Sequence, residues 1–265
     1  MGAALQVVSG RVTNPGGTVT AMTPATGDSF AVQNFNDPAV ARLVSAWALG
    51  ANATGGELSI HSPKMHDNIQ GIRTKWLSAQ SSPLLPLWAD QPLYAQDTLV
   101  VASSGGGAET DGASFLAYYS DLPGANARLF TWSEIKARIR NMLTNEVSIT
   151  TGGTVGDYGG GVAINSLFDL LKANTDYAIL GYLTDTMVQT VGVRGPDTSN
   201  FRVGGPGTNG RIDTRSWFIE LSGAQDLPLI PVFNAANKGA TIIDLVHNAA
   251  GSTVIVDLIL AELAS

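Results

Sequence analysis

His61, His66 and Asp67 are the residues whose types and spacing come nearest to a metal site in this chain. Two imidazoles and a carboxylate can hold a transition metal. However, strand positions five apart point to opposite faces, and Pro63 interrupts the segment. The spacing therefore favours a polar loop with hydrogen-bonded imidazoles, and we expect no metal ligand here.

A glycine-rich segment, Gly205-Pro206-Gly207-Thr208-Asn209-Gly210, matches the pattern G-x-G-x-x-G of dinucleotide-binding loops. Such a loop holds the pyrophosphate at the N-terminus of a helix that follows it. The residues that follow, Arg211–Arg215, show no helical apolar stripe. The pattern therefore indicates a turn between two strands, and we expect no cofactor.

Two further blocks, Gly27-Asp28-Ser29-Phe30 and Asp244-Leu245-Val246-His247, resemble the first and last motifs of GDSL-type (SGNH) hydrolases. The resemblance implies Ser29 as nucleophile, Asp244 as the acid that orients the imidazole, and His247 as base. The family's Gly-x-Asn-Asp block and the long helices of an α/β hydrolase are missing from the sequence. We therefore predict no catalytic residue and no enzyme activity, with this hydrolase as an alternative.

The local group of basic residues consists of Arg128, Lys136, Arg138 and Arg140. On a helix these side chains would project to solvent, where they could approach a phosphate, a carboxylate or a neighbouring subunit. Trp217 belongs to a scattered set of aromatic residues of the kind that anchors protein interfaces or stacks on sugars. The interface candidates are therefore Lys136, Arg138, Arg140 and Trp217.

Composition excludes several classes of protein. The 265 residues include no Cys, which removes disulfides, zinc fingers and iron–sulfur clusters. A formal charge of −7 argues against a module that clamps nucleic acid through phosphate contacts. Charged residues make up 14% of the chain, against roughly 25% in an average soluble protein. Such a surface leaves neutral and apolar area that other copies could cover.

Targeting and membrane signals are also missing from the sequence. The N-terminus has neither a basic region nor an apolar core, so we expect no signal peptide. The most apolar segment, Thr253–Leu263, is too short to span a bilayer and contains Asp257 and Glu262.

The elements that must position these residues are mostly strands. Period-2 alternation and β-branched runs, separated by Gly, Pro, Asn and Asp, predict many short strands, as in a sandwich or barrel. The predicted strands are Leu5–Val8, Thr18–Met22, Ser29–Val32, Glu57–His61, Asn68–Arg73, Thr98–Ala102, Ser114–Tyr119, Glu146–Thr150, Tyr177–Leu183, Thr186–Val193, Thr214–Leu221, Leu229–Phe233, Thr241–Val246 and Thr253–Leu263.

About three short helices are predicted among the strands. The first begins at Asp37-Pro38, carries the stripe Val40, Leu43, Val44 and Trp47, and stops at Gly50. The second begins with the capping box Thr131-Trp132-Ser133-Glu134 and runs to about Thr144. The third runs from Asn165 or Ser166 to about Ala173.

Three glycine-rich loops, near residues 103–108, 151–161 and 204–210, cannot bury enough apolar surface to become ordered alone. They would stay mobile or become ordered against a neighbouring copy. We find no internal repeat of fixed period. The chain is expected to be one β-rich unit over residues 1–265, with a division near 150–160 if it forms two sandwiches.

The C-terminal third resembles the jelly-roll proteins of virus particles. The likeness rests on the runs Asp213–Leu221 and Pro228–Phe233, the turn Asn234–Gly239, and a final apolar strand. It implies a mainly β, jelly-roll-like sandwich, one large or two smaller, and a self-assembling shell protein of a virus or phage.

The leading hypothesis is therefore a structural capsid protein whose partner is itself, together with other virion proteins. Its place would be the virion, assembled in the host cytoplasm. A carbohydrate-binding or adhesive β-sandwich module is the first alternative, and the GDSL-like hydrolase is the second.

Overall fold

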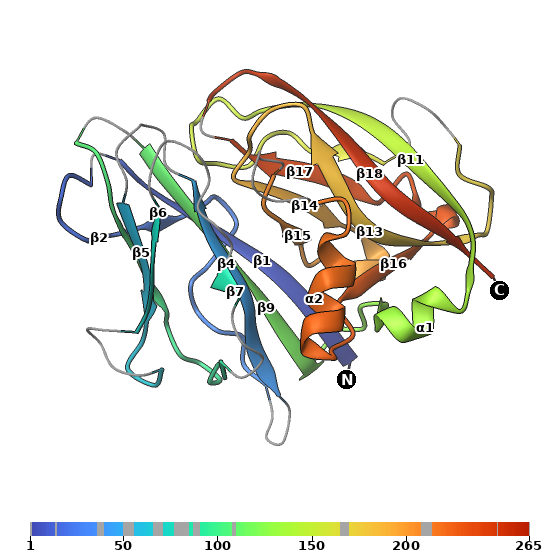
Figure 1. The fold of residues 1–265 in the computed structure, drawn as a ribbon, viewed down its shortest axis with the longest axis horizontal. Coiled ribbons are helices and arrows are strands. Elements are labelled where there is room, and N and C mark those ends of the chain that lie inside the picture. The colour runs from blue at the N-terminus through green and yellow to red at the C-terminus, as the bar shows by residue number, and fades with distance from the viewer. Residues whose placement is uncertain are drawn as a thin grey trace.

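The computed structural model describes residues 2–13, 15–35, 40–49, 56–65, 71–76, 85–86, 91–107, 110–164, 170–207, 214–247 and 249–264. In this part of the chain the fold is mainly β, with four antiparallel sheets and two α-helices (Figure 1). Neither of these helices is long and apolar enough to cross a membrane.

The N-terminal half, residues 2–122, contributes two of the sheets. One has the strand order β3-β1-β9-β4-β7 and the other has the order β2-β8-β5-β6. The strands are β1 (Gly2–Thr13), β2 (Thr20–Ala21), β3 (Thr23–Pro24), β4 (Ala41–Leu49), β5 (Gly56–His61), β6 (Ile72–Trp76), β7 (Leu85–Pro86), β8 (Val100–Ser104) and β9 (Thr110–Leu122).

The C-terminal half, residues 129–263, contributes the other two sheets, with orders β10-β16-β13-β18-β11 and β12-β17-β14-β15. Its strands are β10 (Leu129–Phe130), β11 (Ile139–Thr150), β12 (Val162–Ala163), β13 (Asp176–Thr184), β14 (Thr190–Arg194), β15 (Val203–Gly205), β16 (Ile230–Asn234), β17 (Ile242–Val246) and β18 (Thr253–Leu263). Its helices are α1 (Trp132–Lys136), α2 (Trp217–Gln225) and the 3-10 helices η1 (Pro196–Thr198) and η2 (Ala235–Asn237).

The two halves repeat one strand order. Leaving out the short edge strands β3 and β10, each half has eight strands, which we number from one to eight along its chain. In both halves one sheet reads first-eighth-third-sixth and the other reads second-seventh-fourth-fifth. This repeat lies in the topology and not in residue spacing, so no fixed sequence period shows it. That residues 1–265 form one structural unit stays a prediction.

The first predicted helix is wrong, because Ala41–Leu49 forms strand β4. Seven residues in a row, from Leu43 to Leu49, are buried there. A strand covered on both faces is apolar at nearly every position, so its sequence also satisfies a helical spacing. Asp37, Pro38 and Gly50, the predicted ends of this helix, lie outside the described residues.

The second predicted helix is correct at its start and wrong at its end. Thr131 and Glu134 form the capping box, but α1 ends at Lys136 and the chain continues as strand β11 from Ile139. Pairing with β18 along the length of β11 outweighs the local helical pattern. Residues 165–169 of the third predicted helix lie outside the described part, and residues 170–173 are not helical.

Two predicted strands are also wrong. Residues 214–221 contain the start of α2, where the neighbours Trp217 and Phe218 are both buried. A helix packed between two layers can bury adjacent residues. Ser29–Val32 forms no strand, and a single bridge joins Ala31 to Thr98.

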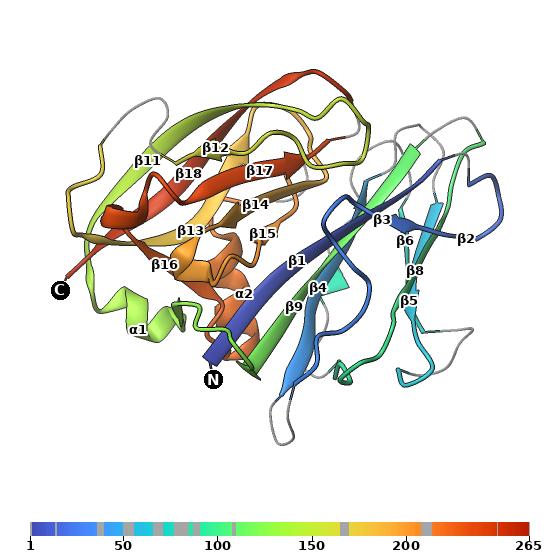
Figure 2. The same cartoon turned by 180° about the vertical axis from the view of Figure 1, so that it is seen from behind.

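The hydrophobic core has two clusters, and strand β1 supplies both. Ala4 and Val8 belong to the cluster between the sheets of the N-terminal half. Leu5 and Val7, on the opposite face of β1, belong to the cluster of the C-terminal half. Figure 2 shows β1 and β9 lying between the C-terminal sheets and the other N-terminal strands. The sheet of β1, β9 and β4 is therefore buried on both faces, and the two halves share an apolar contact.

Candidate functional site

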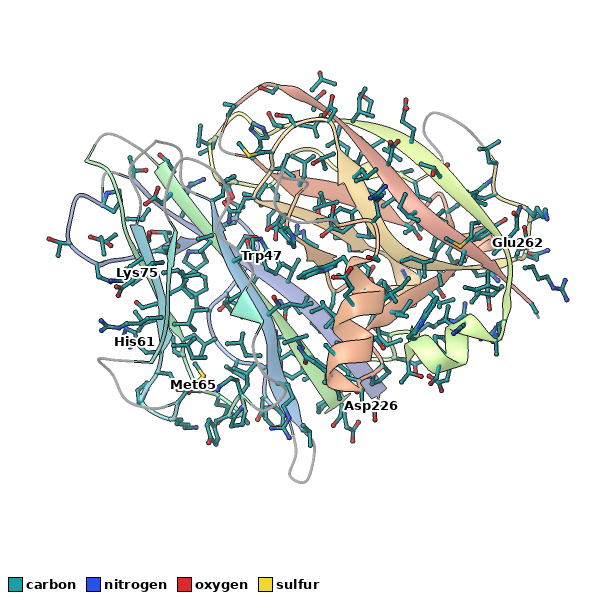
Figure 3. All side chains as sticks on the ribbon, in the orientation of Figure 1. Trp47, His61, Met65, Lys75, Asp226 and Glu262 are labelled. Atoms are coloured by element: carbon teal, nitrogen blue, oxygen red, sulfur yellow. The ribbon has the colours of Figure 1, made fainter. Side chains whose placement is uncertain are left out.

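Two tryptophans meet at the boundary between the halves. The rings of Trp47 on β4 and Trp217 on α2 meet edge to face, with centroids 5.9 Å apart. Both residues are at most 3% exposed, and Figure 3 shows Trp47 deep in the molecule. Trp217, predicted as an interface candidate, thus packs inside one chain, between its halves.

Polar groups at this boundary are paired across it. Gln189 precedes β14, and its side-chain amide donates to the backbone carbonyl of Ala113 at 2.9 Å. The backbone carbonyl of Gln189 accepts from the Trp47 indole N–H at 2.6 Å. A Cβ at Gly112 would collide with the side-chain amide of Gln189, which would have to move out of its hydrogen bonds. Ser114 and Thr190 hydroxyls lie 2.6 Å apart. Because buried polar groups need partners, these bonds favour one arrangement of the halves.

An arginine joins two buried carboxylates at the same boundary. Arg202 lies 3.1 Å from Asp28 of the N-terminal half and 2.9 Å from Asp244 on β17. Its guanidinium lies 3.6 Å from the centre of the Tyr158 ring. Asp28 also accepts from the backbone of Ser9 at 2.7 Å and from the Tyr158 hydroxyl at 3.0 Å. We call Asp28, Tyr158, Arg202 and Asp244 the boundary cluster.

Burial sets the protonation of this cluster. Desolvation raises the pKa of Asp28 to about 6, against the opposite effects of the Ser9 N–H, Arg202 and Tyr158. Desolvation also raises the pKa of Tyr158 well above its ordinary value. Asp28 therefore changes charge in mildly acidic solution while it faces Arg202.

No local sequence pattern reveals the boundary cluster, because its members are far apart in the chain. Asp28 and Arg202 are separated by 174 positions. The available signal was weak: Arg202 and Asp244 are charged residues in an otherwise apolar stretch of strands.

Each of the three residues of the hydrolase alternative, Ser29, Asp244 and His247, binds a group outside this set. Asp244 binds Arg194 and Arg202, while the His247 ring accepts from the backbone of Ala249 at 2.6 Å. The two residues are three positions apart at the end of β17, where side chains alternate between faces. Ser29 is exposed, and its hydroxyl accepts from the Ala31 N–H.

The residues of the predicted polar loop are only partly described. His61 ends strand β5 and is not in a loop, and its buried Nδ1 has no hydrogen-bond partner among the described residues. His66 and Asp67 lie outside those residues. Within the described ranges no group of three His, Asp or Glu side chains is placed to hold a metal ion.

The prediction that the basic residues form one solvated helix face is wrong, because α1 ends at Lys136. Arg128 binds Asp176 through two bonds of 2.9 and 2.6 Å. Arg138 binds the carbonyl of Ala264 and lies over the Phe130 ring. Lys136 is exposed on α1, and Arg140 is exposed at the start of β11. Arg140 also lines a cavity of about 270 Å³ at the strand ends, together with Asn174, Asn234 and Glu262.

A second cavity, of about 370 Å³, lies on the N-terminal half. Phe35, Val40, Arg42, Leu93 and Tyr94 are among its lining residues. Tyr94 is 41% exposed, so one edge of this largely apolar hollow is an accessible aromatic ring.

No family model matches the chain, and no curated protein is similar to it in sequence. Solved structures similar to it include the PBSX exported protein XepA, with 7% identity over 97% of this chain and 86% of that chain and a TM-score of 0.26. The major capsid protein P2 of bacteriophage PM2 has 6% identity over 99% and 98%, with a TM-score of 0.25. A structure of Sulfolobus Turreted Icosahedral Virus has 9% identity over 99% and 80%, with a TM-score of 0.26. TM-scores this low do not establish a shared fold.

Proposed function

We propose that this chain is a shell-forming structural protein of a virus particle, and that each half is a jelly roll. The observation that carries the proposal is the strand order, first-eighth-third-sixth over second-seventh-fourth-fifth, present in both halves. A jelly roll packs eight strands into two sheets. This architecture is common in virus capsid domains, and lectins and cupins share it.

The surface supports self-assembly. With 14% charged residues the chain has few charges to keep separate copies apart. Large apolar side chains are exposed on several strands and loops, among them Met142, Leu170 and Ile255. Contacts with other copies would remove such area from water.

The partners we propose are further copies of the chain and other virion proteins, and the proposed location is the virion. Because the formal net charge is −7, we propose that this chain does not itself neutralise the charge of a genome. We propose no enzyme activity, because the hydrogen bonds of Ser29, Asp244 and His247 go to other groups.

Negative-stain electron microscopy of the expressed chain tests this proposal. Discrete particles or regular sheets of uniform subunits are expected at high protein concentration. A field of single 27.6 kDa molecules under all conditions of salt and concentration would contradict it.

A carbohydrate-binding module is the second candidate, favoured by the cavity beside Tyr94. A half-exposed aromatic ring next to an apolar hollow can stack on a sugar face. A glycan array tests this candidate: a hit that Tyr94→Ala removes, and that the buried-ring control Tyr118→Phe keeps, would support it. No hit with the wild-type chain would exclude it.

A further inference from the structure

Strand β11 is an unusually long free edge. The four sheets have eight edge strands in the described part, and seven of them have two to five residues. β11 has 12 residues and contains neither Pro nor Gly. Proteins usually keep edge strands short or interrupt them, because a long open edge pairs with other chains.

Among the described residues, the hydrogen-bonding groups on the outer side of β11 have no strand partner. Thr151 donates to Ser252 on the β18 side at 2.7 Å, which places the odd-numbered amides toward β18. The even-numbered amides point away. One of them, on Met142, donates to the side chain of Asn141 at 2.9 Å. Those of Thr144, Glu146 and Ser148 have no backbone partner among the described residues.

The charges along this edge are also unbalanced. Glu146 lies directly opposite Asp257 of β18, and like charges in such a pair repel. Within the described ranges no ion pair joins either carboxylate to a cation, and Arg140, in the bulge at the start of β11, is exposed without an ion pair. One end of the edge is therefore basic and its middle is acidic.

We propose that β11 of one copy pairs antiparallel with β11 of a second copy of this chain. This inference rests on the proposed self-assembly and names one of its contacts. With Arg140 of each copy opposite Glu146 of the other, the twofold axis passes between the two Leu143 residues, and Met142 of one copy lies opposite Thr144 of the other. The pairing gives the outward amides of Thr144 and Glu146 carbonyl partners, places a cation beside Glu146 and Asp257, and joins two five-stranded sheets into one.

Disulfide trapping tests the pairing directly, because the chain has no cysteine of its own. Directly opposed strand residues have Cα atoms about 4.5–5.5 Å apart, which suits a disulfide. We expect an equimolar mixture of Met142→Cys and Thr144→Cys chains to form a linked dimer under mild oxidation. Mixing Met142→Cys with Lys75→Cys is the control, because Lys75 is exposed on β6, at the opposite end of the molecule from Glu262 (Figure 3).

A charge exchange gives a second readout. Arg140→Glu should raise the dissociation constant of the dimer by about tenfold, or ~1.4 kcal/mol. Adding Glu146→Arg to that variant should restore wild-type association. Lys136→Glu is the matched control, because it makes the same change in charge on exposed α1, outside the strand. Equal effects of Arg140→Glu and Lys136→Glu in folded protein would overturn the proposal.

The two proposals fail in different ways. Particles that form without a link between Met142→Cys and Thr144→Cys above the Lys75→Cys level would overturn the β11 pairing and leave the shell function standing. A linked dimer without larger particles would support the pairing and count against the shell.

Discussion

The first strands of the two halves, β1 and β11, hold the same place in the same strand order, yet their surroundings differ. Leu5 and Val7 on the outer face of β1 are 0% exposed, because the C-terminal half covers them. On β11 the outer face carries Met142, which is 49% exposed, with Thr144 and Glu146. One topology therefore serves either as an internal boundary or as an open surface, and the side chains on one face of the first strand decide which.

The largest expected effect comes from removing the ring that fills the boundary. Trp47→Ala should lower the free energy of unfolding by about 3–5 kcal/mol, because a large buried side chain leaves a cavity. Met142→Ala on the open face should change it by less than about 0.5 kcal/mol. Denaturant unfolding of both variants measures the difference. Similar losses for the two variants would mean that the boundary around Trp47 is no more buried than the outer face of β11.

Breaking the boundary cluster should cost nearly as much. Arg202→Met leaves Asp28 and Asp244, each with a 2% exposed side chain, without their shared cation, and should destabilise the chain by about 3 kcal/mol. Arg73→Met, at a pair with Glu57 whose arginine is 47% exposed, is the control and should cost about 0–1 kcal/mol. Thermal or denaturant unfolding would contradict this account if the two losses were equal.

A smaller effect should appear in the pH dependence. The pKa of Asp28 is raised on folding from 3.8 to about 6, so the folded chain binds its proton more tightly than the unfolded chain. This stabilisation is present at low pH and is lost as pH rises through about 6. Between pH 5 and pH 7 the free energy of unfolding should fall by about 1 kcal/mol.

The comparison of wild type with Asp28→Asn isolates this contribution. Burial lowers the pKa of His247, which acts in the opposite direction as pH falls, but His247 is present in both proteins. Stability relative to Asp28→Asn should therefore rise for the wild type from pH 7 to pH 5. A constant difference across that range would show that Asp28 does not titrate there.

The smallest expected effect is on the open sheet. Glu146→Thr removes the like-charge pair with Asp257 and places a β-branched residue on a strand, so it should stabilise the isolated chain by about 0.5 kcal/mol. Unfolding at low and at high salt measures this, since screening should reduce the gain. A loss of stability would mean that Glu146 already has a favourable partner in the chain.

Local signals in the sequence were enough for many elements. Alternation of apolar and polar residues, together with β-branched residues, predicts strands at Leu5–Val8 and Thr253–Leu263, and both segments lie in strands. The Thr131–Glu134 capping box fixed the start of α1 because its bonds are local. β4 was missed because burial on both faces gives a pattern without a period of two.

Long-range features could not be predicted in the same way. The boundary cluster needs Asp28 and Arg202 to meet across most of the chain, and no local pattern encodes that contact. The repeated strand order depends on which strands pair, so it became visible only in the sheets. The basic residues were identified, but the change from helix to strand after Lys136 sent Arg138 and Arg140 to different surroundings.

A concentration series of light-scattering mass is the most direct test of the proposal that the open sheet is made for other copies of this chain. We expect masses that rise above 27.6 kDa toward a discrete assembly as the protein concentration increases. A mass that stays at 27.6 kDa up to the solubility limit would contradict it.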